Sequence, residues 1–293
     1  MKIIDLHSHT NASDGTYSPK QLVDYAHVKG LSALAITDHD TTEALAEAKA
    51  YALKYPNLEI ISGIEFSTHS DLCTSDIHIL AYYIQESDLL FQDQLKQLTA
   101  SRSLRNEKMI QKMQEGGLNI TMEDVLSTSE DGIITRAHFA KAMENLGIVK
   151  NMRKAFDKYI GNDGRYYIER EKVTQEMAIQ MIIKNGGVPV LAHPVLYKLN
   201  LKTLDYLLGE LVNYGLQGIE GIYTTYKTHE TQYIKAMAED HGLIVTGGSD
   251  FHGAHKPGID LGTGYGDLQI PYSIRDELYQ AHLMNKKRRL STS

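Results

Sequence analysis

Lys2-Ile3-Ile4-Asp5-Leu6-His7-Ser8-His9-Thr10 opens the chain, followed by Asn11-Ala12-Ser13-Asp14-Gly15. The apolar run predicts a buried strand that ends where the histidines begin. Side chains two residues apart on a strand point the same way, so His7 and His9 can address one point, with Asp14 within reach. Imidazole and carboxylate ligands suit Zn, Mn or Fe better than Ca. The alternative is a strand end with chance histidines.

The bulk composition limits the classes of function. The 293 residues suffice for one large domain, or for a domain with an insertion. A formal charge of -7 argues against a broad basic surface for long nucleic acid, but not against a phosphate substrate, because bound cations can invert the local charge. No apolar run approaches the roughly 18 residues of a membrane span. We find no sign of a protein partner.

A cytoplasmic location is expected for two reasons. The first strand begins almost at residue 1, which leaves no room for a signal segment. Cys73 is the only cysteine, so an intramolecular disulfide is impossible.

Strand-like and helix-like stretches alternate along most of the chain. Strands are expected near 2–6, 31–36, 58–64, 76–83, 187–192, 218–222 and 243–246, with helices between most of them. About seven such repeats predict an α/β fold, with a parallel barrel preferred to an open sheet. Residues 86–172 break the alternation with helical patterns. We therefore expect a barrel domain over 1–85 and 173–293, a helical insertion over 86–172, and a solvated basic tail, 286–289, after the last helix.

Metal-ligand side chains cluster at the predicted strands. They lie in or just beyond them, mostly at C-terminal ends, where barrel enzymes build active sites: His7, His9, His39, Glu65, His78, His193, Asp250 and His252. The set exceeds the needs of one ion, so it predicts two or three metals, with Glu65 as the best placed bridge. Neighbouring metals hold a bridging hydroxide as nucleophile and neutralise phosphate oxygens, which predicts hydrolysis of a phosphate ester.

Six motifs, in order, resemble those of the PHP (polymerase and histidinol phosphatase) superfamily. They are Asp5-Leu6-His7-Ser8-His9 with Ser13-Asp14-Gly15, Thr37-Asp38-His39-Asp40, Gly63-Ile64-Glu65, His78, Ala192-His193-Pro194, and Gly248-Ser249-Asp250-Phe251-His252. The resemblance implies a distorted seven-stranded, TIM-like barrel with a trinuclear centre.

The resemblance also implies a ligand set of nine residues. One metal would be held by His7, His9, Glu65 and Asp250, a second by Glu65, His78 and His193, and a third by Asp14, His39 and His252. Asp5 and Asp38 are expected either to orient imidazoles or to serve as structural caps. The metal could be Mn, Fe or Zn.

The insertion resembles that of one PHP subgroup. Ile134-Thr135-Arg136-Ala137-His138-Phe139-Ala140 and Ala155-Phe156-Asp157-Lys158-Tyr159 are similar to the insertion of the TrpH/YciV proteins. That subgroup is associated with 5'-to-3' trimming of short RNAs and with removing a phosphate from nucleoside 3',5'-bisphosphates. Its usual pattern is Arg-Pro-His, from which Ala137 departs.

The insertion and closing loop supply candidate substrate contacts. Arg136 offers a bidentate fork and His138 a second donor, so we expect both to clamp the non-reacting phosphate, with His138 a possible acid for the leaving group. Lys256 is expected to touch phosphate. The alternative for Arg136 and His138 is capping or packing within a helical lid.

Two further features allow two interpretations each. Arg102, Arg105, Lys108 and Lys112 form a stripe at helical spacing, which indicates a solvated face unless the arginines face the substrate. Tyr223 and Tyr226 follow a strand and could stack a base or pack.

The predicted function is therefore a metal-dependent phosphoesterase. It would act on a small nucleotide, converting a nucleoside 3',5'-bisphosphate to the 5'-monophosphate, or on short 5'-phosphorylated RNA. Histidinol-phosphate phosphatase is the second enzyme candidate, and a non-catalytic metal-binding regulatory module is the candidate of another class.

Overall fold

The computed structural model describes residues 2–73, 76–129, 134–168 and 173–292. The strands are β1 (Ile3–Asp5), β2 (Leu31–Ile36), β3 (Glu59–Thr68), β4 (Ile77–Tyr82), β5 (Val188–Leu191), β6 (Gly218–Tyr223) and β7 (Ile244–Gly248). The helices around the sheet are α1 (Pro19–Val28), α2 (Glu43–Ala52), α7 (Gln175–Asn185), α8 (Leu201–Tyr214), α9 (Thr228–Asp240) and α10 (Ser273–Thr292), with the short 3₁₀ turns η2 (Pro194–Tyr197) and η3 (Gly253–His255). The helices between β4 and α7 are α3 (Leu89–Glu115), α4 (Met122–Leu126), α5 (Arg136–Asn145), α6 (Met152–Ala155) and the π-helix η1 (Phe156–Ile160).

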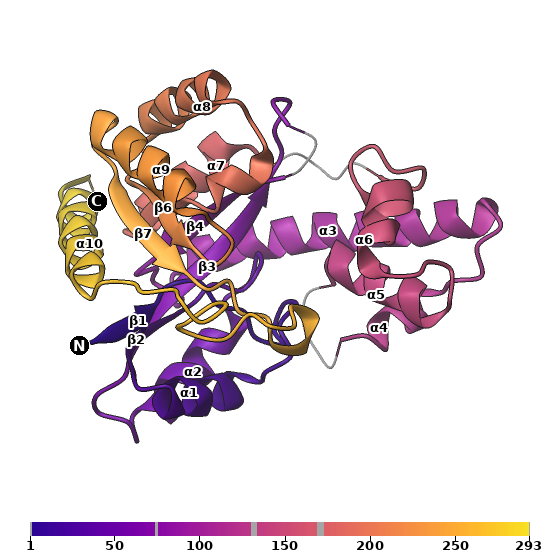
Figure 1. Cartoon of the computed structure of the whole chain (residues 1–293), viewed down its shortest axis with the longest axis horizontal. Coiled ribbons are helices and arrows are strands. Elements are labelled where there is room, and N and C mark those ends of the chain that lie inside the picture. Colours follow the sequence, from indigo (N-terminus) through magenta and orange to yellow (C-terminus); the bar gives the residue numbers. More distant parts are fainter. Residues whose placement is uncertain (1, 74–75, 130–133, 169–172, 293) are drawn as a thin grey trace.

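The seven strands form one sheet in sequence order, curled into a nearly closed barrel (Figure 1). The predicted α/β barrel with a helical insertion is confirmed. The expectation that its strands are all parallel is wrong, because β4 runs antiparallel to both β3 and β5. Only residues 69–76 separate β3 from β4, too few for the crossover of about a dozen residues that parallel strands need. The reversal places the N-terminal end of β4, with His78, at the same rim as the C-terminal ends of the other strands.

Both faces of the sheet are buried, which explains why the strands read as continuous apolar runs. In β2, Ala33 and Ala35 pack inside the barrel with Ile4, Leu6 and Val190. Leu34 and Ile36 point outward into the layer formed with the surrounding helices. Small residues inside and large residues outside fit the limited interior of a seven-stranded barrel.

At the seam of the barrel, the first and last strands are joined by backbone hydrogen bonds between the residues that follow them at the rim, rather than between the strands themselves. The Asp250 N–H donates to the His7 carbonyl and the His9 N–H donates to the Phe251 carbonyl, both at 2.9 Å. Gly248 permits this approach, because a Cβ there would lie 2.2 Å from the Cβ of His7. The seam therefore brings the two histidine-bearing ends of the chain together.

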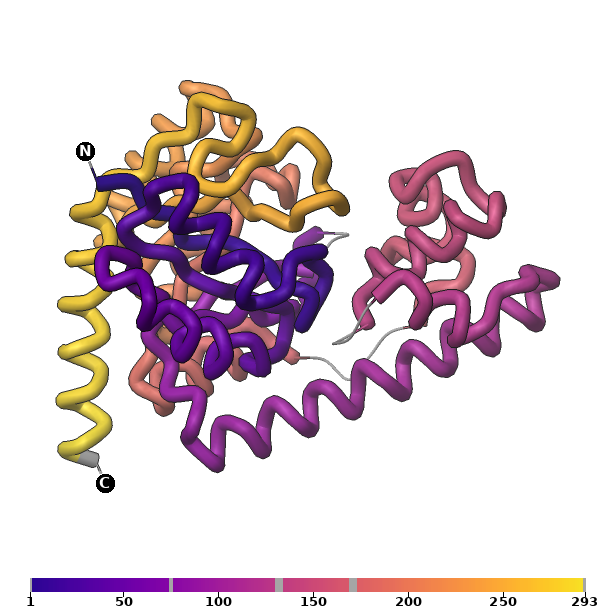
Figure 2. The backbone as a smooth tube through the Cα atoms, turned by 90° about the horizontal axis from the view of Figure 1, so that it is seen from below, coloured from indigo at the N-terminus to yellow at the C-terminus, as the bar shows by residue number. Residues whose placement is uncertain are grey.

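The segment between β4 and α7 forms a lobe with a core of its own, built from residues such as Met109, Met113, Phe139 and Ile160. The 27-residue helix α3, about 40 Å long, joins this lobe to the barrel. Its first turns pack Phe91 and Leu95 into the outer barrel core, and its last turns belong to the lobe core. Figures 1 and 2 show α3 running from the barrel to the lobe.

The C-terminal helix differs from expectation. The basic tail belongs to α10, which continues through it to Thr292. Lys286, Lys287 and Arg288 are exposed, as expected, whereas Arg289 is half-buried. The Arg289 guanidinium binds Asp88 and the Asn185 carbonyl, so its charge is used to fix the start of α3 against α7 and α10. Within the described ranges, no helix combines the length and the apolar character that crossing a bilayer requires.

Candidate metal centre

His7 and His9 leave β1 at the barrel rim and point at two carboxylates. Their Nε2 atoms each lie 3.3 Å from Glu65 Oε2, and 3.5 and 3.4 Å from Asp250 Oδ1. Both side chains are fully buried, yet neither Nε2 atom has a hydrogen-bond partner within the described part of the chain. Buried nitrogens that lack a partner are costly unless an ion takes their lone pairs.

Glu65 faces two groups with its two oxygens. Oε1 lies 2.9 Å from His78 Nδ1 and 3.0 Å from His193 Nε2. Oε2 lies near His7 and His9, and 3.3 Å from His39 Nδ1. A carboxylate that divides its oxygens in this way has the geometry of a bridging ligand.

A third group surrounds Asp14. Its Oδ1 lies 3.3 Å from His252 Nε2 and 3.5 Å from His9 Nδ1, and its Oδ2 lies 3.8 Å from His39 Nε2. All nine residues expected as metal ligands are thus brought to one rim. Their ligand atoms form four overlapping groups, each with its atoms within 4.8 Å of one another.

The spacing and chemistry of these atoms fit divalent metals. Four bonds of about 2.1 Å in a tetrahedral site place neighbouring ligand atoms about 3.4 Å apart, close to the distances around Glu65 and Asp250. Burial alone would raise the pKa values of Glu65, Asp14 and Asp250. Neighbouring imidazoles, joined by Lys256 at Asp250, outweigh burial and lower these three pKa values well below the ordinary range. The carboxylates are therefore ionised, as metal binding requires.

Backbone strain concentrates at this rim. His193, Asp250 and Asp40 adopt positive φ angles of 27°, 57° and 52°, a region that residues with a Cβ rarely enter. Such strain persists where the surrounding structure holds a functional arrangement in place.

Glu220 is a site residue that the sequence reasoning missed. It is fully buried on β6, its Oε1 lies 3.0 Å from His7 Nδ1, and its Oε2 accepts the N–H of His193 at 2.8 Å. The sequence did contain one indication of this role, a glutamate within the apolar run 218–222. A charged residue in a buried strand is expected to have a partner, because such residues are rarely fully buried without one.

Of the two roles expected for Asp5 and Asp38, the structural one fits their contacts. Asp5 accepts the backbone N–H groups of His7, Ser249 and Gly262, which ties the two ends of the barrel seam. Asp38 accepts from Thr10 and Ser13 and so fixes the loop that carries Asp14.

Two further side chains bind Asp250. Lys256 Nζ and the Tyr223 hydroxyl both bind Asp250 Oδ2, the latter at 2.6 Å. Burial disfavours the charged form of Lys256, but Asp250 outweighs it and raises the pKa of the ammonium. Tyr223 is buried in this contact rather than exposed as a platform for a base.

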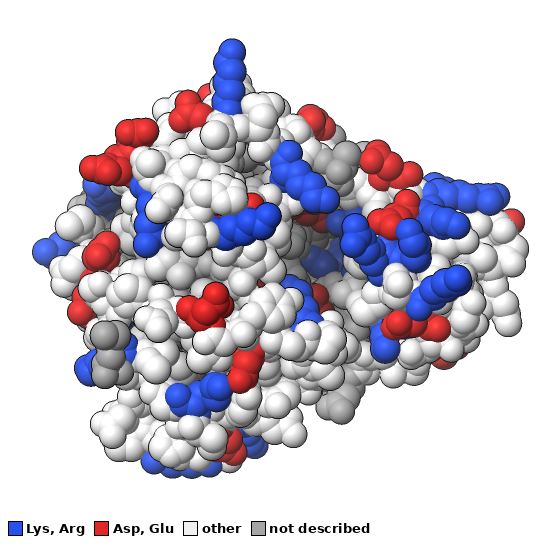
Figure 3. Space-filling model, viewed as in Figure 1, with Lys and Arg blue, Asp and Glu red and all other residues white. Residues whose placement is uncertain are grey.

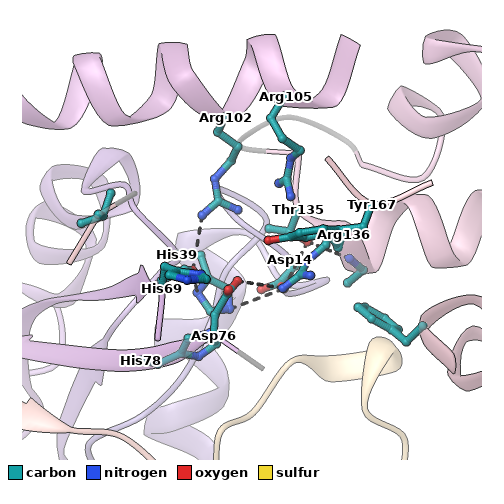
Figure 4. A pocket seen from close by; sticks show the side chains of 14 residues that line it. Asp14, His39, His69, Asp76, His78, Arg102, Arg105, Thr135, Arg136 and Tyr167 are labelled. Atoms are coloured by element: carbon teal, nitrogen blue, oxygen red, sulfur yellow. Dashed lines mark hydrogen bonds and ion pairs between the residues drawn. The ribbon is translucent and has the colours of Figure 1, made fainter. Parts of the chain in front are cut away.

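A pocket of about 150 Å³ separates the metal-ligand residues from the helical lobe. Asp14, His39 and His78 lie at one side of it, and Figure 4 shows Arg102 and Arg105 descending from α3 towards them. The stripe on α3 is therefore not simply solvated, because both arginines are buried. Arg102 pairs with Asp40 at the rim. Figure 3 shows the surface hollowed between barrel and lobe, with Lys and Arg atoms around the hollow.

Arg136 and His138 both lie in the first turn of α5. Arg136 lines the pocket and binds Asp76 at 2.7 Å, with Asn162 as its second partner. His138 is buried and is not among the residues that line the pocket; its Nδ1 accepts the Thr135 N–H at 3.0 Å in a capping box. Burial lowers the pKa of His138 to about 4, so the imidazole is neutral at pH 7 and its Nε2 carries the proton.

Known proteins resemble this chain over most of its length, and not only in the motifs. Over 261 residues the chain is 34% identical to the 5'-3' exoribonuclease Rnm of Escherichia coli (strain K12), covering 89% of this chain and 88% of that protein. Over 263 residues it is 30% identical to the 3',5'-nucleoside bisphosphate phosphatase of Chromobacterium violaceum, covering 89% and 91%.

The fold has close solved counterparts. A structure of an amidohydrolase from Chromobacterium violaceum, with bound sulfate and no metal, superposes with a TM-score of 0.84 at 29% identity over 95% of this chain and 96% of that one. The PHP domain family matches residues 5–249, a range that contains seven of the nine ligand-type residues. The other two, Asp250 and His252, come directly after it. With the motifs, the barrel and the cluster of ligand atoms in agreement, the chain belongs to the PHP domain family.

Proposed function

We propose that the chain removes a phosphate from a small nucleotide, converting a nucleoside 3',5'-bisphosphate to the 5'-monophosphate, or acts on short 5'-phosphorylated RNA. That the chain is a hydrolase, a metal-dependent phosphoesterase, follows from its family and relatives. The observation that carries the substrate proposal is one pocket with metal-ligand residues on one side and Arg102, Arg105 and Arg136 on the other. Such a pocket suits a substrate with two phosphate groups.

The nine rim residues would hold three divalent ions. We assign the first to His7, His9, Glu65 and Asp250, the second to Glu65, His78 and His193, and the third to Asp14, His39 and His252; Mn, Fe and Zn all suit these ligands. Bound metals would supply Lewis acidity towards the phosphate oxygens and an activated water as nucleophile. The chain's own part is to fix the scissile phosphate beside Glu65 and to keep Asp14, Glu65 and Asp250 ionised.

The arginine side of the pocket would hold the phosphate that does not react. Arg136 presents its guanidinium from the first turn of α5, and exchange of its contact with Asp76 for a phosphate would give a stronger bidentate pair. His138 Nε2–H is a hydrogen-bond donor, and its low pKa makes it a donor to a phosphate oxygen rather than a proton source for the leaving group. Lys256 adds positive charge beside Asp250.

We also propose that residues 86–172 form a lid that selects the substrate, attached to a barrel domain of residues 1–85 and 173–293. The separate lobe core and the arginines of α3 and α5 support this division. A nucleotide substrate and a single cysteine accord with a cytoplasmic enzyme. The names of the relatives favour nucleotide substrates over histidinol phosphate.

The test is phosphate release from adenosine 3',5'-bisphosphate by the purified chain, with Mn²⁺ and with excess chelator. We expect chelator-sensitive release of one phosphate and formation of adenosine 5'-monophosphate. Histidinol phosphate and a short 5'-phosphorylated RNA complete the panel. Turnover of histidinol phosphate alone, or release unaffected by chelator after the metals are shown to be lost, would contradict the proposal.

Arg136→Ala separates the clamp from the metal centre. It should lower kcat/KM for adenosine 3',5'-bisphosphate far more than for adenosine 3'-monophosphate, which lacks the second phosphate. Arg165→Ala, on an exposed side chain of the same lobe, is the matched control. Equal losses on both substrates would mean that Arg136 only supports the fold of the lobe.

A further inference from the structure

Two aromatic side chains of the lobe face the candidate active site. Phe156 and Tyr167 both line the pocket that reaches Asp14, His39 and His78. Both are partly exposed, and Phe156 packs against the lobe core, where neighbouring large apolar side chains are buried. A ring left half open on a pocket wall exposes apolar area that a flat ligand could cover.

Phe156 is placed by an unusual piece of backbone. It begins the π-helix η1, directly after α6. Turns of this kind are rare and occur frequently at functional sites. Within the described part of the chain the Phe156 ring stacks on no other aromatic ring, whereas Tyr159, three residues later, stacks on Tyr166 with centroids 5.8 Å apart and planes 10° apart. The two rings of this turn therefore differ: one completes the core and one borders the pocket.

Tyr167 is coupled to the phosphate side of the pocket. The Arg136 guanidinium lies 5.4 Å from its ring centroid, and the two side chains lie together in Figure 4. Cation–π contact fixes the ring while the guanidinium keeps its polar contacts with Asp76 and Asn162. An aromatic surface and a phosphate-binding fork are thus adjacent, and phosphate and base are the parts of a nucleotide that such groups bind.

We propose that Phe156 and Tyr167 form a stacking seat for the nucleobase of the substrate. The inference rests on the proposed nucleotide substrate and deepens it. The sugar would span from the metal-ligand residues to the lobe, with the free phosphate at the arginines and the base on the aromatic side chains. Phe156 offers a π-face without hydrogen-bonding groups, so the seat accepts any base, and the enzyme discriminates little between adenine, guanine, cytosine and uracil.

Kinetics of matched variants tests the seat. Phe156→Leu keeps an apolar side chain but removes the ring, and Tyr159→Leu removes a ring from the same turn outside the pocket. The substrates are adenosine 3',5'-bisphosphate and the 3,5-bisphosphate of methyl riboside, which has no base. Phe156→Leu should lower kcat/KM roughly 10- to 100-fold on the adenosine substrate and leave the base-free one unchanged. Tyr159→Leu should affect both substrates alike. Equal losses on both substrates in Phe156→Leu would overturn the seat.

A second measurement does not depend on turnover. The chain has no tryptophan, so Phe156→Trp introduces a single indole into the pocket, and Tyr159→Trp places one outside it. Adenosine 5'-monophosphate should quench the first indole, whereas ribose 5-phosphate should not, and neither ligand should quench the second. Adenosine 5'-monophosphate that is bound by equilibrium dialysis without quenching would overturn the seat.

The two measurements also separate the seat from the reaction. Quenching by adenosine 5'-monophosphate, together with no phosphate release from either bisphosphate, would support the seat and overturn the proposed reaction. Phosphate release that is indifferent to the base in every variant would support the reaction and overturn the seat.

Discussion

Glu220 positions two of the nine rim residues with one carboxylate. Its Oε1 pairs with His7 Nδ1 and its Oε2 with the backbone N–H of His193, so β6 organises the centre although it contributes no expected ligand. A carboxylate at Nδ1 holds the proton there and turns the Nε2 lone pair towards Glu65 and Asp250. Residues in this role affect metal binding without touching the metal.

We predict that Glu220→Gln weakens metal binding about 10- to 100-fold with little change in fold. The amide keeps the size of the side chain but can accept from only one of its two partners through oxygen. Competition with a chromogenic chelator and metal analysis of the dialysed protein would measure the loss, with circular dichroism to check the fold. Glu239→Gln, on an exposed side chain of α9, is the control. Unchanged metal affinity would show that His7 needs no partner on β6.

The nine ligand-type residues could be expected from sequence because their motifs are local and the barrel topology collects strand ends at one rim. The roles of Arg102, Tyr223 and Glu220 could not, because each depends on a partner far away in the chain: Asp40, Asp250 and His7. Arg102 is buried on a helix whose sequence predicts a solvated stripe, because it meets Asp40 at the barrel rim.

At the scale of elements, α1 and the loop after β7 are fastened by one carboxylate. Asp260 accepts from Lys29 Nζ at 2.6 Å and from the Tyr25 hydroxyl at 2.5 Å. Partial burial alone would raise the pKa of Asp260, but the hydrogen bonds from Lys29 and Tyr25 outweigh it and lower the pKa below the ordinary value. The Asp260 hydrogen bond raises the pKa of Tyr25 to about 12.

We predict that Asp260→Asn destabilises the chain by about 0.5–1 kcal/mol at pH 7, a figure reduced for the solvent exposure of the pair. Because the folded pKa is depressed, the contribution of Asp260 is present above its unfolded pKa of about 3.9 and is lost as the pH falls through the folded value. Urea unfolding of wild type and Asp260→Asn at pH 7, 4 and 3 should show the difference shrinking below pH 4. Asp267→Asn, exposed in the same loop, is the control. A difference that stays constant down to pH 3 would contradict the assignment.

The order of elements followed from hydrophobic periodicity, but their direction and ends did not. β4 has the composition of any buried strand, and only the short connection after β3 distinguishes a reversed strand from a parallel one. The end of α10 was placed too early, because a run of basic residues suggests a tail beyond the helix. Lys286, Lys287 and Arg288 are exposed as expected, whereas Arg289 binds Asp88 at the start of α3. The length of one connection decided the first case, and a contact between distant elements decided the second.

At the scale of the whole molecule, the rim residues connect parts of the barrel that backbone hydrogen bonds join only weakly. The nine side chains follow or belong to β1, β2, β3, β4, β5 and β7, and the β1–β7 seam closes through few backbone bonds. Without a cation, ionised Asp14, Glu65 and Asp250 are held near one another mainly by imidazoles, with Lys256 and Tyr223 as further partners of Asp250. Bound metals would therefore fasten the barrel as well as serve the reaction.

We predict that chelation lowers the unfolding temperature of the chain by roughly 5–10 °C. A ligand that binds only the folded state at a hundred times its Kd stabilises it by about 2.7 kcal/mol, and each kcal/mol corresponds to about 2–4 °C for a chain of this size class. Differential scanning calorimetry of dialysed protein, with and without Mn²⁺, measures the shift. Asp14→Asn should show a smaller shift, and Glu239→Gln the full one. Hydrogen exchange should then place the lost protection in β1, β3 and β7 and spare α4 and α5, because the lobe has its own core. The same unfolding temperature with metals fully removed, or loss of protection centred on the lobe, would show that the barrel closes without the ions.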